Sequence, residues 1–124
     1  QLAVKLGYHI AIITGGNTPA IQSRYSALGI SDIFMGQSSK IEVYQQWRDA
    51  HNLANDEIMY MGDDMPDLPV LRAVGMPVCP ADACTDVKQV VRYISAFNGG
   101  ECCVRDVIEQ VLRAQGKWGT DLNW

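Results

Sequence analysis

Short apolar runs that alternate with glycine-containing turns and helix-length segments are the feature that most constrains the fold of this 124-residue chain. The runs lie at residues 10–14, 32–36, 58–61, 77–79 and 93–94. An almost unbroken apolar run is typical of a strand that is buried on both faces of a parallel sheet. Parallel strands in turn need helical crossovers between them. We therefore predict an α/β domain, a Rossmann-like three-layer sandwich with a mainly parallel sheet.

Helix signals fill the segments between these runs. Thr18 and Pro19 are expected to open the first full helix, and Ser38 or Ser39 is expected to cap the next one. Helices are predicted at residues 19–28, 40–51, 66–73, 85–91 and 103–114. The predicted apolar face of the last helix consists of Val104, Val107, Ile108, Val111 and Leu112.

Size and composition exclude several classes of protein. The length suits one domain, and a composition of 48% hydrophobic and 19% charged residues is that of a globular chain. A net charge of -4 without a cluster of Lys and Arg argues against a nucleic-acid-binding protein, which needs a basic face. No apolar run approaches the roughly 20 residues that span a bilayer, and the first residues lack a signal-peptide pattern. We expect a cytoplasmic protein that binds neither nucleic acid nor membrane.

We assign residues 1–116 to the domain and residues 117–124 to a tail without periodicity. Trp118 and Trp124 in this tail are predicted to dock onto a neighbouring subunit, because large apolar side chains are rare on a monomer's surface. The spacing of the cysteines fits neither a zinc site nor a disulfide scaffold, so reduced thiols are expected. The cysteines are Cys79, Cys84, Cys102 and Cys103.

Polar residues follow three of the predicted strands, where ligands bind in sheets of this kind. Thr14 and Gly15 follow the first strand, and Lys40 follows the second at the start of a helix. A hydroxyl and glycine N–H groups can bind an anion. Taken alone, the first feature is more typical of an ordinary turn and the second of a solvated lysine.

The third strand is followed by three carboxylates, those of Asp63, Asp64 and Asp67. Their mutual repulsion has an electrostatic cost, which a cation would offset. Carboxylate oxygens at a strand end suit Mg²⁺, which takes one or two carboxylates and keeps several waters. A solvated loop at a helix N-terminus is the alternative. The loop from Gly62 to Asp67 is therefore predicted to bind Mg²⁺.

The order of Thr14, Lys40 and the Gly-Asp-Asp-x-x-Asp loop resembles that of the haloacid dehalogenase superfamily of phosphatases. The resemblance implies that Thr14 and the following glycine bind the transferring phosphoryl group and that Lys40 neutralises charge on the nucleophile and phosphoryl oxygens. It further implies that Asp63 is the direct Mg²⁺ ligand. Asp64 and Asp67 would then hold metal-bound waters or orient Lys40.

Longer stretches narrow the resemblance. GYHIAIITGG, LGISDIFMGQSSK, YMGDDMPDLPVL and the late GG-x-x-x-x-R stretch, which ends at Arg105, are similar to the 3-deoxy-D-manno-octulosonate 8-phosphate phosphatases. This family implies Mg²⁺-dependent hydrolysis of a sugar-acid phosphate in lipopolysaccharide biosynthesis, a fold without a large cap domain, and a homotetramer. Arg105 would contact the substrate or the neighbouring subunit, and a surface arginine at a helix start is the alternative.

Two departures from the family pattern leave alternatives open. The first motif, D-x-D-G-V, which carries the nucleophile and the general acid/base, is absent from residues 1–124. We expect a chain that lacks an upstream strand and flap, and a non-catalytic fragment that forms oligomers is the alternative. Many relatives also carry Arg where this chain has Gly16, so a phosphatase for a nine-carbon sialic-acid-type phosphate remains possible. A phosphoacceptor receiver domain is disfavoured, because there the acidic pair precedes the Thr and Lys.

Overall fold

A computed structural model describes residue 3 and residues 6–16, 19–99 and 103–117. The chain forms two compact units, one made of Gln1–Ser38 and Ile108–Trp124 and the other of Ser39–Val107. Within the described ranges, no helix combines the length and the apolar character needed to cross a lipid bilayer. The predicted boundary between a domain at 1–116 and a tail stays a prediction, because residues 118–124, with Trp118 and Trp124, lie outside the described residues.

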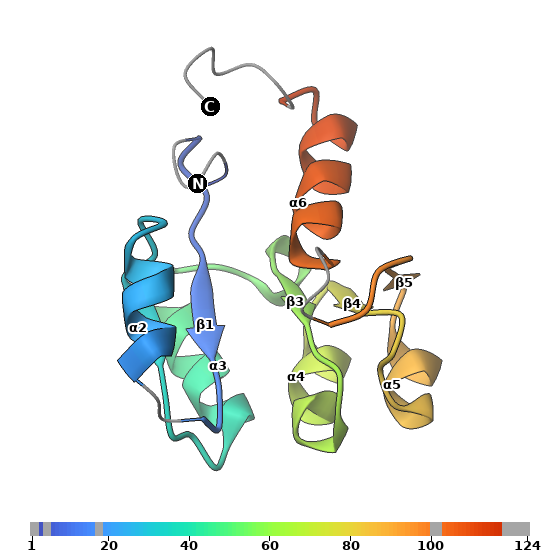
Figure 1. Cartoon of the computed structure of the whole chain (residues 1–124), viewed down its shortest axis with the longest axis horizontal. Coiled ribbons are helices and arrows are strands. Elements are labelled where there is room, and N and C mark those ends of the chain that lie inside the picture. Colours follow the sequence, from blue (N-terminus) through green and yellow to red (C-terminus); the bar gives the residue numbers. More distant parts are fainter. Residues whose placement is uncertain (1–2, 4–5, 17–18, 100–102, 118–124) are drawn as a thin grey trace. The chain divides into compact units, whose positions relative to one another are not determined.

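The first unit is built on a parallel pair of strands, and the first strand of the pair is the blue arrow in Figure 1. β1 (Ala11–Ile13) pairs with β2 (Asp32–Phe34), and α2 (Pro19–Ser26) forms the crossover between them. The strands are half-buried rather than buried on both faces as predicted. Each has a single partner strand in the described part of the chain, so each strand has one unpaired edge there.

Glycine ends α2 in the way its sequence predicts. The N–H of Gly29 donates to the carbonyl of Ser26 at 3.0 Å, and the N–H of Ile30 donates to that of Tyr25 at 3.1 Å. This pair of bonds is a Schellman motif, and it needs a left-handed residue, which Gly29 supplies with φ of 87°. The helix begins at Pro19 as expected, whereas the predicted Thr18 cap lies outside the described residues.

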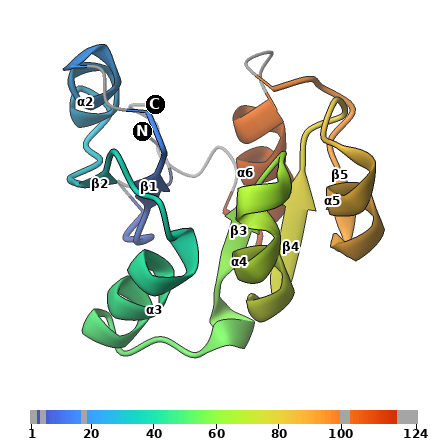
Figure 2. The same ribbon diagram turned by 90° about the horizontal axis from the view of Figure 1, so that it is seen from below.

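The second unit contains a three-stranded parallel sheet with the order β3-β4-β5 (Figure 2). The strands are β3 (Met59–Met61), β4 (Met76–Cys79) and β5 (Tyr93–Ile94). The helices are α3 (Lys40–Ala50), α4 (Leu68–Ala73) and α5 (Thr85–Val90), with 3₁₀ turns η1 (Asn55–Glu57) and η2 (Met65–Asp67). The predicted α/β alternation is confirmed, and Ser39 is the N-cap of α3, although its side chain makes no capping bond.

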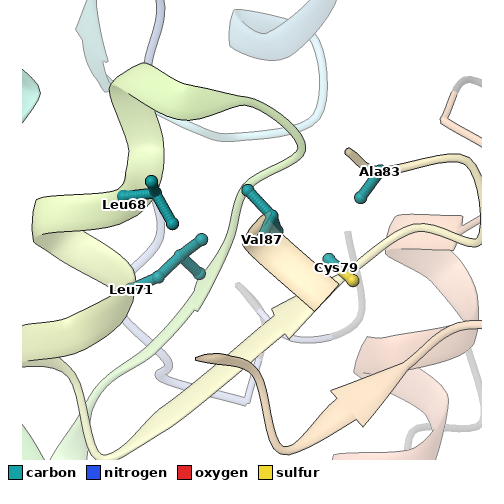
Figure 3. Packing of buried hydrophobic residues seen from close by; sticks show 5 residues of the cluster. All are labelled: Leu68, Leu71, Cys79, Ala83 and Val87. Carbon is teal, nitrogen blue, oxygen red and sulfur yellow. The ribbon is translucent and has the colours of Figure 1, made fainter. Parts of the chain in front are cut away.

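The core of this unit lies between α4, α5 and β4, all of which contact one another. Leu68 and Leu71 of α4 point toward Val87 of α5 in Figure 3, and Cys79 at the end of β4 lies beside them. Ala83, in the connection to α5, completes the cluster. This packing fixes α4, and with it the turn that precedes α4 at the end of β3.

The boundary between the units falls within α6 (Cys103–Ala114), whose limits agree with the prediction. The predicted apolar face is wrong at Val104, which is 56% exposed. Val107 and Leu112 are buried as predicted, and Cys103 is buried where Val104 was expected. Cys103 and Val107 lie one turn apart, so their side chains share a face, whereas Val104 is rotated by about 100° from Cys103.

Truncation of Leu71 tests the importance of the core. Leu71 is 1% exposed, so Leu71→Ala is expected to lower the free energy of unfolding by about 3 kcal/mol through lost burial and a cavity. Leu28→Ala removes the same atoms from a side chain that is 38% exposed, and it is expected to cost less than about 1 kcal/mol. Urea unfolding of both variants measures the difference, and equal losses would contradict this description of the core.

Candidate active site

The acidic loop begins directly after β3 and turns into η2 and α4. Asp64 is the N-cap of η2, and its Oδ1 accepts a hydrogen bond from the backbone N–H of Met65 at 2.8 Å. Asp63 and Asp64 are exposed, but Asp67 is only 3% exposed. The three carboxylates that the sequence places together therefore have different surroundings.

Asp67 is the centre of a hydrogen-bond network. Its Oδ1 accepts from Lys40 Nζ at 2.9 Å and from the Tyr60 hydroxyl at 2.6 Å. Its Oδ2 accepts from the backbone N–H groups of Asp63 at 3.1 Å and Asp64 at 3.4 Å. A carboxylate offers about four lone-pair sites, so these donors satisfy the buried charge. The same contacts join Lys40 to the end of β3.

Gly62 is required by the packing of Asp67. A Cβ at position 62 would lie 2.4 Å from the Cβ of Asp67 and 2.7 Å from its Cγ. Real side chains do not approach so closely, so any larger residue would push Asp67 away from its donors. The glycine of the predicted motif thus has a steric reason within the loop itself.

The pKa values of the two carboxyl groups shift in opposite directions. Burial raises the pKa of Asp67, but the hydrogen bonds from Tyr60 and Lys40 outweigh it and lower the pKa below its usual value. Partial desolvation, followed by the negative charge of Asp67, raises the pKa of Asp63, although that residue as a whole is exposed. Burial, followed by the hydrogen bond to Asp67, raises the pKa of Tyr60 and keeps its hydroxyl protonated.

Thr14 lies at the end of β1 in the other unit. Its N–H donates to the carbonyl of Phe34 at 2.9 Å, and its carbonyl accepts from the N–H of Gln37 at 3.1 Å. Its Oγ1 accepts from the N–H of Gly16 at 3.0 Å, so the hydroxyl hydrogen can donate to a ligand. A Cβ at Gly15 would meet only the carbonyl of Gln37 at 3.8 Å, so packing alone does not require glycine there.

The predicted site residues are divided between the two units. Lys40, Asp63, Asp64 and Asp67 form one network, and Thr14 and Gly15 form a separate turn in the other unit.

Arg105 is exposed near the start of α6. Within the described ranges, no three His, Cys, Asp or Glu side chains are grouped so that they alone could hold a metal ion. The assignment of Mg²⁺ to Asp63 therefore remains a prediction.

Tyr60 is the member of this network that the sequence analysis missed. It lies in the middle of β3, which was treated only as an apolar run. A buried tyrosine needs a partner for its hydroxyl, so a Tyr within a strand predicted to be buried is a signal for a nearby acceptor. The acidic loop immediately after the strand supplies one.

Comparison with known proteins places the chain in a family. The family model described as haloacid dehalogenase-like hydrolase matches residues 17–104, more than half of the sequence. The chain belongs to the haloacid dehalogenase-like hydrolase family. The matched region includes Lys40 and the whole loop from Gly62 to Asp67.

Relatives support the narrower resemblance. The chain is 35% identical over 117 residues to 3-deoxy-D-manno-octulosonate 8-phosphate phosphatase KdsC of Escherichia coli (strain K12). The match covers 94% of this chain and 62% of that relative. The crystal structure of the corresponding phosphatase from Yersinia pestis matches with a TM-score of 0.93 and 31% identity over 96% of this chain and 64% of that chain. The predicted resemblance and fold class are confirmed.

A third relative was solved with ligands. The 3-deoxy-D-manno-octulosonate 8-phosphate phosphatase of Moraxella catarrhalis, in complex with magnesium, phosphate and a KDO molecule, matches with a TM-score of 0.91 and 32% identity. The match covers 94% of this chain and 67% of that one.

Removal of the buried charge tests the role of Asp67. Asp67→Asn is expected to lower the free energy of unfolding at neutral pH by about 3 kcal/mol, because Lys40 and Tyr60 lose their charged acceptor. Since folding lowers the pKa of Asp67, the stabilisation is full above the unfolded value of about 3.9 and is lost as the pH falls through the lower folded value. Asp64→Asn keeps a good cap and is the control. Urea unfolding between neutral and acid pH measures the free energy of unfolding of both variants. Equal losses in the two variants would contradict this role of Asp67.

The steric role of Gly62 gives a second test. Gly62→Ala is expected to destabilise the fold by about 2 kcal/mol, because the new methyl group overlaps Asp67. Gly99→Ala is the control, since its Cβ would meet nothing closer than an Asp82 oxygen at 3.5 Å. Thermal unfolding followed by circular dichroism compares the two, and a Gly62→Ala protein as stable as the control would show that the loop repacks without loss.

Proposed function

We propose that the full-length protein is a Mg²⁺-dependent phosphatase of a sugar-acid phosphate, with 3-deoxy-D-manno-octulosonate 8-phosphate as its substrate. The observation that carries the proposal is the ammonium group of Lys40, held 2.9 Å from a buried carboxylate at the end of β3, beside the exposed Asp63. The similarity to phosphatases of this substrate class supports it. The chain spans 62% of that Escherichia coli relative, so this activity is assigned to the whole protein.

In this proposal Lys40 stabilises negative charge. An ammonium group has three hydrogens, and one of them is directed to Asp67. The other two can donate to the nucleophile and to a phosphoryl oxygen. Fixed donors of this kind lower the barrier to phosphoryl transfer, because the charge that spreads over the oxygens meets a group already in place.

Asp63 is proposed as the Mg²⁺ ligand. Its backbone is held on both sides, because its N–H donates to Asp67 and its carbonyl accepts from the N–H of Cys84 at 3.0 Å. Its carboxylate is exposed, which suits a cation that binds through one or two carboxylates and several waters. Asp64, also exposed, is proposed to hold one of those waters. When bound, Mg²⁺ would polarise the phosphoryl oxygens.

Thr14 and Gly15 are proposed to bind the phosphoryl group. The Thr14 hydroxyl retains a hydrogen to donate while its oxygen accepts from Gly16. Glycine at position 15 lets an anion approach the backbone N–H without a side chain in the way. Support for this role comes from the position of Thr14 directly after β1, the strand end at which sheets of this kind bind ligands.

The nucleophile is proposed to be an aspartate outside these 124 residues, since no D-x-D-G motif occurs in them. Its carboxylate oxygen would form a bond to phosphorus as the bond from phosphorus to the sugar oxygen breaks, and the leaving oxygen would take a proton. Water would then attack phosphorus and release phosphate together with the regenerated carboxylate. Residues 1–124 would supply the groups that hold and neutralise the phosphoryl group.

Assembly and pathway follow the same resemblance. We propose a cytoplasmic homotetramer that serves lipopolysaccharide biosynthesis, in which Arg105 contacts the substrate or the neighbouring subunit. The exposure of Arg105 near the start of α6 is compatible with either contact. A nine-carbon sialic-acid-type phosphate is the alternative substrate, because many family members carry Arg where this chain has Gly16 and relatives that act on nine-carbon phosphates vary at this position.

Phosphate release by the full-length protein tests the proposed function. Asp63→Ala is expected to lower kcat by about 10²-fold or more, because the metal loses a carboxylate ligand. A chelator should abolish activity, and added Mg²⁺ should restore it. Asp86→Ala changes an exposed aspartate in α5 and is the control. Full activity of Asp63→Ala, or activity that resists the chelator, would refute the proposal, and a higher kcat/KM on the nine-carbon phosphate would favour the alternative substrate.

A further inference from the structure

The hydroxyl of Tyr60 and the ammonium group of Lys40 donate to the same acceptor oxygen. Both groups donate to Oδ1 of Asp67, Tyr60 at 2.6 Å and Lys40 at 2.9 Å. The Tyr60 side chain packs against the hydrophobic cluster around Leu71. The hydroxyl therefore approaches Asp67 from a ring that the strand and the core hold in place.

The rigidity of the Tyr60 ring matters because the side chains of Asp67 and Lys40, the other two members of this contact, are flexible. The carboxyl group of an aspartate turns easily about its last side-chain bond. The lysine ammonium group lies at the end of a flexible four-carbon chain. Two backbone donors reach Oδ2 of Asp67 at 3.1 and 3.4 Å, and the Tyr60 hydroxyl, which the packed core positions, donates to Oδ1 at the shorter distance of 2.6 Å. The direction of the Asp67–Lys40 bond is thus set from the core.

We propose that Tyr60 is a positioning residue for Lys40, which it acts upon through Asp67 without contacting the substrate. This inference rests on the proposed function, in which the Lys40 ammonium group must lie where the phosphoryl charge develops. Loss of the Tyr60 hydroxyl would leave Oδ1 to Lys40 alone. The carboxyl group could then turn, and the ammonium group would follow it away from the phosphoryl group.

The same unit contains a matched control. The hydroxyl of Tyr93 in β5 donates to Oδ2 of Asp106 at 2.8 Å, and the Ser95 hydroxyl donates to that oxygen at 2.8 Å. This arrangement repeats a tyrosine hydroxyl and a second donor on one carboxylate oxygen. The second donor there is a serine rather than Lys40. Tyr93→Phe therefore removes a comparable bond without touching the Lys40 network.

The test compares Tyr60→Phe with Tyr93→Phe in the full-length protein. Tyr60→Phe is expected to lower kcat for 3-deoxy-D-manno-octulosonate 8-phosphate by about tenfold, with KM changed less than about threefold, because the misplaced group acts on the transition state. The two variants are expected to lower the melting temperature by similar amounts. Tyr93→Phe is expected to keep kcat within about twofold of the parent. A kcat for Tyr60→Phe that falls no further than that of Tyr93→Phe would overturn the proposal.

A second measurement needs no catalytic turnover, and it separates the positioning role of Tyr60 from the proposed phosphatase function. The Lys40 ammonium group is followed in a proton–nitrogen correlation spectrum of the lysine side chains, with Lys40→Arg to identify its signal. We expect Tyr60→Phe to shift or broaden this signal and Tyr93→Phe to leave it in place. An unchanged signal in Tyr60→Phe would refute the positioning role. If the parent protein releases no phosphate but the signal moves as expected, the proposed function fails while the coupling of Tyr60 to Lys40 stands.

Discussion

A buried carboxylate, that of Asp67, determines how the loop after β3 is built. A charge that is removed from water is strongly destabilising unless it is paired and hydrogen-bonded. Four donors meet it here, from Lys40, Tyr60 and two backbone N–H groups, and they come from α3, β3 and the loop itself. Gly62 leaves room for the side chain. One unfavourable burial therefore ties a helix, a strand and a turn together at the place where ligands bind in sheets of this kind.

The same carboxylate explains how three aspartates can occupy one short loop. Each has a separate role in the structure: Asp67 is neutralised by Lys40, Asp64 caps η2, and Asp63 is exposed with its backbone held. Repulsion between like charges falls when each is matched by its own partner or by solvent. Among the three, Asp63 is the residue that we propose as the metal ligand, and its backbone N–H donates to the carboxylate of Asp67.

The sequence predicts local structure better than it predicts which distant side chains contact one another. Apolar runs locate the strands, and glycine locates the end of α2, because both signals act through neighbouring residues. The Lys40–Asp67 bond joins residues 27 positions apart. Motif order predicts that both matter, and a tyrosine in a buried strand indicates a nearby acceptor without identifying it as Asp67. Val104 shows the same limit, because periodicity gives a helix but only tertiary packing decides which of two adjacent faces is buried.

The start of α3 carries a residue that the stability of the helix alone would not favour. Lys40 is the first residue of this helix, and a positive charge there opposes the helix dipole. Ser39 adopts the cap position without making a side-chain capping bond, so Glu42 is the group in the first turn whose charge suits the helix dipole. The ion pair with Asp67 compensates for the unfavourable charge, because it places a carboxylate 2.9 Å from the Lys40 ammonium group. A residue that breaks a local rule and is held by a buried partner is what a functional site requires, since helix stability alone would favour another residue at this position.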